Sequence, residues 1–207
     1  MIELKDKKGR TFAYRVIDNP CQALSDREKQ LLVDQLTPVT ARGFLRREIT
    51  QELRDDVKNH VIDCHRLGIA ECGDGEVAAF CARSIRCVEP EGVIYHLEGI
   101  IVEDKSQGLG RAILHKELQD TKADILAFHT QSIRMIRLGQ ALSEMDVLLA
   151  IKLAMAINSR NPQGDIDIDR YGGKSLYGDV DAFSIDAIGD IDWRRGDAKI
   201  FAGRIRK

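Results

Sequence analysis

The chain has 207 residues, of which 43% are hydrophobic and 31% are charged, and its formal net charge at pH 7 is −2. This length suits one globular domain with a full core, or one domain with an appendage. A net charge so close to zero gives no electrostatic reason to expect nucleic acid or an anionic membrane as the main partner.

The cysteine content favours a reducing compartment. No Cys-x-x-Cys pair occurs, and the number of cysteines is odd: Cys21, Cys64, Cys72, Cys81 and Cys87. Buried, reduced thiols of a cytoplasmic protein explain this pattern better than a metal site or a disulfide framework. No apolar run reaches membrane-spanning length, and the charged first ten residues do not resemble a signal peptide. We therefore expect a cytoplasmic protein without a metal site.

The N-terminal part predicts a strand and a helix. Residues 11–17 alternate between apolar and polar side chains, as a strand does, and Asn19-Pro20 ends this pattern. Ser25 and Glu28 form a capping-box signature for a helix that starts after Ser25. We expect its apolar face to comprise Leu31, Leu32 and Leu36.

A second amphipathic helix is predicted where apolar residues recur every four positions among charges, at Leu45, Ile49, Leu53 and Val57. Residues 61–72 and 76–87 then predict two strands. The Gly-Asp-Gly sequence at 73–75 joins them and indicates a hairpin. Pro90-Glu91-Gly92 turns the chain into the next strand.

Residues 93–118 contain the most informative pattern in the chain. An apolar strand over 93–102 leads through a polar turn at 103–107 into a helix over 108–120 that opens with glycines. N–H groups at a helix start have no intrahelical partner and carry the positive end of the helix dipole, and glycines let a phosphate come close to them. The pattern predicts an anion-binding loop at the end of a buried strand.

The loop sequence is more specific than that. Gln107-Gly108-Leu109-Gly110-Arg111-Ala112 matches Q/R-x-x-G-x-G/A, the pyrophosphate-loop motif of the GNAT N-acetyltransferases, and the strand before it ends in Ile100-Ile101-Val102. In these residues the chain resembles a GNAT, which implies acetyl-CoA or another acyl-CoA as co-substrate. A Rossmann fingerprint would need a third glycine where Ile113 stands, and a Walker loop would need Gly-Lys-Ser/Thr.

The rest of the chain follows the order of that family. Residues 123–130 predict a strand, and a helix from Ser132 has a strongly apolar second half over 147–157. Residues 161–164 break this helix, and a loop-rich stretch leads to a closing strand at 199–205. The predicted fold class is α+β, with a GNAT-like mixed, mostly antiparallel central β-sheet flanked by helices on both faces.

We expect one GNAT-like domain over residues 1–207. Its acceptor-side half covers about 1–92, its CoA-binding core about 93–160, and its C-terminal loop and strand about 161–207. The resemblance implies that main-chain N–H groups over 108–112 hold the pyrophosphate and that the strand end pairs with the pantetheine arm. Arg111 adds a charge contact or is simply solvated. The cofactor-binding residues expected on this basis are Ile100, Ile101, Val102, Gln107, Gly108, Leu109, Gly110, Arg111, Ala112 and Ser132.

The candidate catalytic residues are His96 and Glu98, two positions apart on the strand before the loop and therefore on one face of it. Members of the resembled family commonly place a glutamate base on this strand, and His96 stands where some of them keep it. Either side chain suits a general base for the acceptor amine, directly or through water. The alternative is a polar pair that serves only packing.

Two positions depart from the family pattern. Ser132 stands where an asparagine is usual, and Gly139 stands where a tyrosine usually protonates the leaving thiolate. Tyr171, Tyr177 or water remain as proton donors. Residues 129–131 at the end of the preceding strand are expected to face the cleft, with helix capping by Thr130 or Ser132 as the alternative.

Two further segments leave alternatives open. The stretch 164–197 is acidic and suits either a cation-attracting rim or a solvated loop, and its spacing does not fit a calcium loop. Its aspartates are Asp165, Asp167, Asp169, Asp179, Asp181, Asp186, Asp190, Asp192 and Asp197. The apolar helix over 147–157 packs on the sheet or lies in a homodimer interface.

Two functions are implied by the resemblance. The first is an N-acetyltransferase that moves an acetyl group from acetyl-CoA to a primary amine of a small molecule, peptide or protein, directly in a ternary complex. The second is an acyl-CoA-binding regulator that has lost turnover, which the departures at Ser132 and Gly139 favour.

Overall fold

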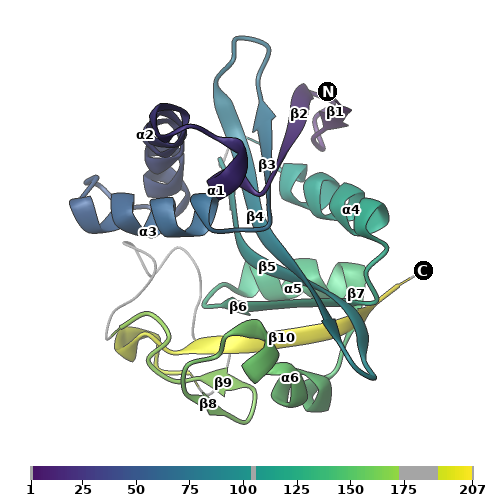
Figure 1. Ribbon diagram of the computed structural model, residues 1–207. Coiled ribbons are helices and arrows are strands. Elements are labelled where there is room, and N and C mark those ends of the chain that lie inside the picture. The colour runs from purple at the N-terminus through teal and green to yellow at the C-terminus, as the bar shows by residue number, and fades with distance from the viewer. Residues whose placement is uncertain (1, 104–105, 173–190, 207) are drawn as a thin grey trace. The chain divides into compact units, whose positions relative to one another are not determined.

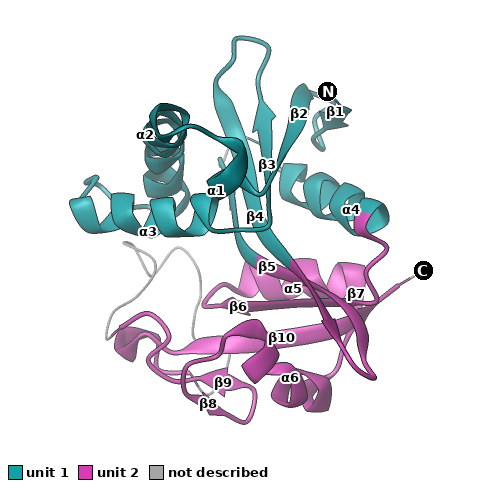
Figure 2. Cartoon of the chain, viewed as in Figure 1, with its two compact units in different colours: residues 1–84, 98–120 teal, residues 85–97, 121–207 magenta. Residues whose placement is uncertain are grey.

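A computed structural model describes residues 2–103, 106–172 and 191–206 of the chain (Figure 1). The chain forms two compact units, coloured separately in Figure 2. Unit 1 consists of Met1–Ser84 and Glu98–Asp120, and unit 2 of Ile85–Leu97 and Thr121–Lys207. Two long strands, β4 (Val77–Val88) and β5 (Gly92–Val102), contribute residues to both units.

The sheet of unit 1 has the strand order β1–β2–β3–β4–β5. Pairing is antiparallel between β1 (Ile2–Lys5), β2 (Thr11–Asp18), β3 (Arg66–Glu71) and β4. The hairpin at residues 73–75 is confirmed, but the strand predicted over 61–72 begins only at Arg66, because Val61 and Ile62 end helix α3 (Gln51–Ile62). The sequence did not predict β1, which is a short strand of mostly exposed residues with only Leu4 buried.

Unit 1 contains the helices α1 (Pro20–Ala23), α2 (Asp26–Gly43), α3 (Gln51–Ile62) and α4 (Leu109–Thr121). The predicted capping box of α2 is confirmed, with the Ser25 N–H donating to Glu28 Oε2 at 2.8 Å. Helices α2 and α3 share one apolar core with β3 and β4. Its fully buried members include Leu36, Val61, Leu67 and Ile69.

Three residues predicted on the apolar faces of these helices are not part of a buried helix face. Leu31 is on α2 but is 54% exposed. Leu45 and Ile49 precede α3, because Thr50 caps that helix by accepting a hydrogen bond from the Leu53 N–H at 3.2 Å. Leu45 has φ 53°, which a helix interior excludes, and Ile49 is 48% exposed. The predicted start of the second helix was therefore wrong.

Unit 2 has the strand order β5–β6–β10–β9–β8. Strand β6 (Ile125–Thr130) is parallel to β5 and antiparallel to β10 (Ala198–Ile205), and β10 is antiparallel to β9 (Ile166–Asp167). A short hairpin links β9 to β8 (Pro162–Gln163). One parallel pair among antiparallel ones makes a mixed, mostly antiparallel sheet, which confirms the predicted fold class.

The single helix predicted from residue 132 to residue 157 was wrong. The structure has α5 (Ile133–Leu142), a strand β7 (Ser143–Met145), α6 (Val147–Leu153) and the 3₁₀ turn η1 (Met155–Ile157). Strand β7 pairs with β10, and the side chain of Asp146 caps α6 by accepting the Leu149 N–H at 3.0 Å. The composition of residues 132–157 favours one helix, but pairing with β10 and the N-cap at Asp146 divide it into two.

The apolar second half of that segment has two different faces. Leu149, Ala150, Leu153, Ala154 and Ile157 are buried in the core of unit 2. Val147, Leu148, Ile151 and Met155 are exposed by 45%, 78%, 44% and 75%. The segment thus packs on its own unit, and self-association through its exposed side chains stays a prediction. Within the described ranges, no helix combines the length and apolar character that a bilayer crossing requires.

Candidate functional site

The predicted strand, glycine loop and helix are present in unit 1. Strand β5 ends at Val102, the Ser106 N–H donates to the Glu103 carbonyl at 2.9 Å, and α4 begins at Leu109. Gly108 has φ +88°, a conformation that L-residues with a side chain rarely adopt. The loop therefore turns sharply into the helix at its first glycine. Residues 104 and 105 lie outside the described residues.

The main-chain N–H groups of this loop divide into two sets. The Leu109 N–H donates to the Ser106 carbonyl and the Ala112 N–H to the Gly108 carbonyl, both at 3.1 Å, so these two groups build the turn itself. An anion would use the N–H groups of Gly108, Gly110 and Arg111. These groups belong to the loop and the first helical turn, where the helix dipole also favours negative charge.

A segment far away in the sequence lies against this loop. The Lys7 N–H, in the turn between β1 and β2, donates to the Gln107 carbonyl at 2.9 Å. A Cβ atom on Gly108 would lie 2.6 Å from Lys7 Cγ. The carboxylate of Asp6 orders the turn by accepting the Lys8 N–H at 2.8 Å and the Arg10 Nε–H at 2.7 Å. Sequence reasoning missed Lys7 because no local pattern links positions 7 and 107.

Gly110 has a packing role in addition to the expected one. The motif predicts that this glycine lets a phosphate approach the main chain, which stays a prediction. A Cβ atom on Gly110 would lie 3.2 Å from Val102 Cγ2 and 3.7 Å from Ile100 Cδ1. The glycine therefore allows α4 to pack closely on β5, and this contact brings Ile100 and Val102 together with the loop.

Further along α4, a buried polar network holds the helix on the sheet. Glu117 accepts a short hydrogen bond from the Tyr14 hydroxyl, and its other carboxylate oxygen pairs with Arg83 Nη2. The three side chains are exposed by 1% or less. Burial is the main reason that the pKa of Tyr14 lies far above its ordinary value, so this hydroxyl stays protonated. We call this set the Tyr14–Glu117–Arg83 network.

The two candidate catalytic residues lie on β5 as predicted, but in different surroundings. His96, in unit 2, is 3% exposed, and its ring lies 6.0 Å from that of His129 at 79°. Glu98, in unit 1, is partly exposed. Burial, followed by the charge of Glu98, raises the pKa of the Cys64 thiol to about 12. Because Glu98 is partly exposed and His96 is buried, Glu98 is the more accessible of the two as a base.

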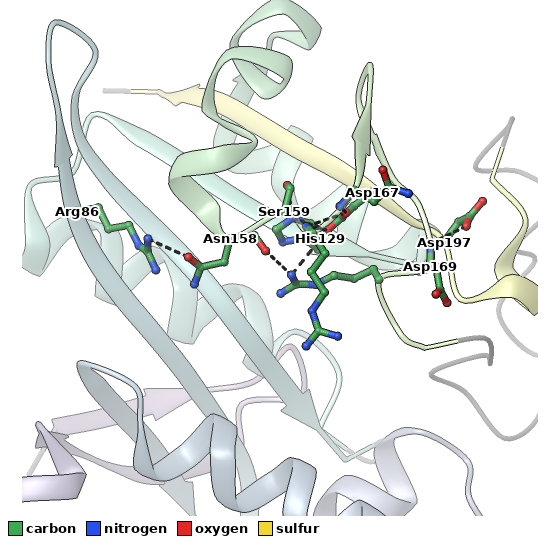
Figure 3. Close-up of polar contacts among 10 residues, drawn as sticks. Arg86, His129, Asn158, Ser159, Asp167, Asp169 and Asp197 are labelled. Atoms are coloured by element: carbon green, nitrogen blue, oxygen red, sulfur yellow. Dashed lines mark hydrogen bonds and ion pairs between the residues drawn. The ribbon is translucent and has the colours of Figure 1, made fainter.

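Unit 2 also contains a buried histidine that was expected at the cleft. His129 Nε2 lies 2.9 Å from Ser159 Oγ and 3.5 Å from Asp167 Oδ2 (Figure 3). Burial lowers its pKa to about 2, with smaller contributions from the charges of Arg170 and His96, so the imidazole is neutral. In a catalytic triad the carboxylate bonds the other ring nitrogen. The His129 cluster therefore does not have the geometry of a triad.

The residues after His129 serve local structure. Thr130 Oγ1 accepts the Ser132 N–H at 2.9 Å in a turn just before α5, and Ser132 makes no side-chain cap hydrogen bond, so neither residue caps the helix as the alternative expected. Gln131 Nε2 donates to the Asp197 carbonyl at 2.9 Å. Ser132 is 3% exposed and stands at the N-cap of α5.

A side chain at Gly139 would press against two aromatic rings. A Cβ atom on Gly139 would lie 2.8 Å from Cζ of both Phe128 and Phe201. These two rings stack with centroids 4.5 Å apart and planes 7° from parallel. The stacked pair fills the space, which gives a packing reason for the departure from the family pattern.

The described aspartates of the acidic stretch are engaged in structure. Asp167 and Asp197 are exposed by 1% or less, and Asp167 accepts the Arg160 and Asn161 N–H groups at 3.0 and 2.8 Å. Asp192 caps a short 3₁₀ turn, and Asp165 pairs with Lys199 at 2.6 Å. Asp169 and Asp192 are exposed, so the alternative of a cation-attracting rim stays a prediction. Outside the described residues lie Tyr177, Asp179, Asp181, Asp186 and Asp190.

None of the five cysteines, all of which lie in the described residues, forms a disulfide; Cys64 and Cys81 are buried, whereas Cys21 and Cys87 are exposed. The expectation that all are buried was therefore wrong. In the part of the chain that the structure describes, no group of three or more His, Cys, Asp or Glu side chains is arranged to hold a metal ion.

Comparisons with known proteins return structures but no sequence relatives. No family model matches the chain, and no curated protein matches it. An acetyltransferase of the GNAT family from Listeria monocytogenes is 12% identical with a TM-score of 0.46, and the match covers 99% of this chain and 100% of that one. An agmatine N-acetyltransferase mutant in its apo form is 11% identical with a TM-score of 0.46, covering 93% and 99%.

A further match is a GCN5-related glucosamine N-acetyltransferase region in a fungal multi-domain GH3 β-N-acetylglucosaminidase. It is 16% identical with a TM-score of 0.40, and covers 56% of this chain but only 13% of that much longer one. All three proteins are acetyltransferases by name. Similarity at this level carries no argument about function, so the functional assignment rests on the residues of the chain itself.

Proposed function

We propose that the chain is an acyl-CoA-dependent N-acetyltransferase that transfers an acetyl group to a primary amine within a ternary complex. The observation that carries this proposal is the Gln107–Ala112 loop. Its sequence matches the pyrophosphate motif, its first glycine has a positive φ, and it leads from an apolar strand into the start of α4. A helix start of this kind suits a diphosphate, the anionic part of the CoA molecule.

Each part of the loop has a separate task in this proposal. The N–H groups of Gly108, Gly110 and Arg111 would bind the diphosphate oxygens. The exposed ammonium groups of Lys7 and Lys8, on the turn that packs against Gly108, would add positive charge beside them. The main chain of Ile100–Val102 would pair with the pantetheine arm.

Acetyl-CoA would supply an activated thioester, and the chain would handle the proton of the amine. Glu98, or His96, would accept a proton from the ammonium group of the acceptor. The free amine would then attack the thioester carbonyl carbon, and the C–S bond would break. The nitrogen would release its second proton to water as the amide forms, and the thiolate would take a proton from water. The acceptor in this proposal is a small-molecule or peptide amine.

A regulator that binds acyl-CoA without turnover is the second candidate. Its supporting observation is Gly139, which stands in place of the usual tyrosine acid and packs against the stacked Phe128 and Phe201 rings. Both candidates would bind acyl-CoA through the glycine loop, but only the first would transfer the acetyl group to an amine.

Two measurements on the full chain test the proposal. Acetyl-CoA at about one hundred times its dissociation constant should add about 2.7 kcal/mol to the free energy of unfolding. A panel of amines should then release free CoA thiol. Binding with no release for any amine would favour the regulator, and the absence of binding would contradict both candidates.

A further inference from the structure

Glu117 is a charged side chain on the buried face of α4. The other buried side chains of this face are Leu109, Ile113, Leu114 and Leu118, and Glu117 is only 1% exposed. Burying a carboxylate is costly, and apolar residues of similar volume often replace a buried ion pair without loss of stability. Stability alone therefore does not account for a glutamate here.

The carboxylate of Glu117 is held from two strands at once. The Tyr14 hydroxyl comes from β2 and the Arg83 guanidinium from β4, and β3 lies between these strands. Gly68 of β3 makes room for this arrangement, because a Cβ atom there would lie 1.8 Å from the Tyr14 hydroxyl oxygen. The Tyr14 ring thus reaches across β3 to meet the helix.

Two fixed partners define one register of the helix. A slip by one residue turns an α-helix by about 100° and moves it by about 1.5 Å along its axis. An apolar face tolerates such changes with modest repacking, whereas a carboxylate with a partner on each oxygen does not. The Tyr14–Glu117–Arg83 network therefore fixes both the rotation and the axial position of α4 on the sheet of unit 1.

The glycine loop is rigidly connected to this anchor. Gly110 and Glu117 are seven positions apart, close to two full helical turns, so they lie on the same face of α4. Gly110 packs against Val102 and Ile100 at the N-terminal end of that face. The position of Glu117 therefore determines where the N–H groups of the loop and the first turn point.

We propose that Glu117 is a positioning residue for the diphosphate group of acyl-CoA. Through Tyr14 and Arg83 it holds α4 in the register that presents the N–H groups of Gly108, Gly110 and Arg111 together. This inference rests on the proposed function for the identity of the ligand, but the placement of the loop can be measured without ligand.

The test uses the full chain with the three partners replaced together by apolar residues, as Tyr14→Phe/Arg83→Met/Glu117→Leu, so that no charge is left buried alone. We expect this variant to fold with a thermal midpoint at or above that of the wild type. Its dissociation constant for CoA should rise about tenfold or more, because a small misplacement of binding groups is costly. The amide resonances of Gly108 and Gly110 should shift in the ligand-free protein.

Two further variants separate positioning from stability. Leu36→Ala removes a fully buried side chain from α2 in the same unit and should lower the midpoint without changing CoA affinity or the two glycine resonances. Glu117→Gln keeps an acceptor for the Tyr14 hydroxyl and should lose less affinity than the triple variant. Wild-type affinity with unmoved glycine resonances in the triple variant would overturn the inference.

If the triple variant does not fold, Tyr14→Phe alone tests the positioning role, because it removes a single oxygen atom from the network and keeps the aromatic ring. We expect a higher KM for acetyl-CoA with kcat retained, and an unchanged KM would refute the positioning role. If the wild-type chain binds no CoA, the proposed function fails, and the glycine resonances of the ligand-free variants still decide whether Glu117 places the loop.

Discussion

The main-chain N–H of Lys7 donates to the carbonyl oxygen of Gln107 at 2.9 Å. This bond attaches the turn of the first hairpin to the entrance of the glycine loop, and the Lys7 side chain then fills the space in front of Gly108. The turn between β1 and β2, which carries no motif, therefore lies against the glycine loop.

Gly108→Ala should weaken both the fold and CoA binding. The positive φ alone should cost about 1–2 kcal/mol in the free energy of unfolding, and the new methyl group would also meet Lys7 Cγ. The matched control is Gly75→Ala, since Gly75 has φ +85° with no atom within 4 Å of the added Cβ. Urea unfolding and CoA titration should show a greater stability loss for Gly108→Ala, and a loss of affinity only there. Equal losses would mean that Lys7 does not constrain the loop.

Glu98→Gln and His96→Ala test the assignment of the base. Removal of a general base should lower kcat by about 10²- to 10⁴-fold while the dissociation constant for CoA is retained. Because Glu98 is partly exposed and His96 is buried, we expect the larger effect at Glu98. Glu3→Gln, an exposed carboxylate on β1, is the control. Full activity in both variants would show that the base lies elsewhere.

Gly139→Tyr should destabilise the protein and restore no proton donor. The side chain would press into the stacked Phe128 and Phe201 rings, and overpacking of this kind costs about 1–3 kcal/mol or more. Gln140→Tyr adds the same side chain at the next, exposed position of α5 and should change stability by less than about 0.5 kcal/mol. Thermal unfolding compares the two variants. A stable Gly139→Tyr protein with increased turnover would refute this packing argument.

His129 should make the protein sensitive to acid. Its folded-state pKa of about 2 lies below the ordinary value of 6.5, so below pH 6.5 the unfolded chain binds a proton that the folded chain does not. The stabilisation is complete above pH 6.5 and is lost as the pH falls toward 2, by about 1.4 kcal/mol per pH unit. His129→Gln should flatten the dependence of unfolding free energy on pH by that amount.

The control for this experiment is Ser159→Ala, which removes the hydrogen-bond partner of His129 but keeps the imidazole. It should lower stability by about 1 kcal/mol with the pH slope retained. A His129→Gln profile parallel to that of the wild type would show that folding does not lower the pKa of His129.

Several features of the molecule could be predicted from sequence because they depend on neighbouring residues. The capping box at Ser25, the hairpin at 73–75 and the passage from β5 through the glycines into α4 are local patterns of side chain and backbone. The order of these elements also predicted the mixed sheet, since a crossover between β5 and β6 requires a parallel pair.

Tertiary structure decided the features that depend on residues far apart in the chain. Strand β7 exists because β10 pairs with it, although its residues extend a helical pattern. Lys7 lies against the loop, where its N–H donates to the Gln107 carbonyl. Glu117 is held in place because Tyr14 and Arg83, from two other strands, contact its carboxylate. Side-chain period and composition describe a single segment, whereas these contacts depend on which segments the fold brings together, and a local pattern contains no information about that.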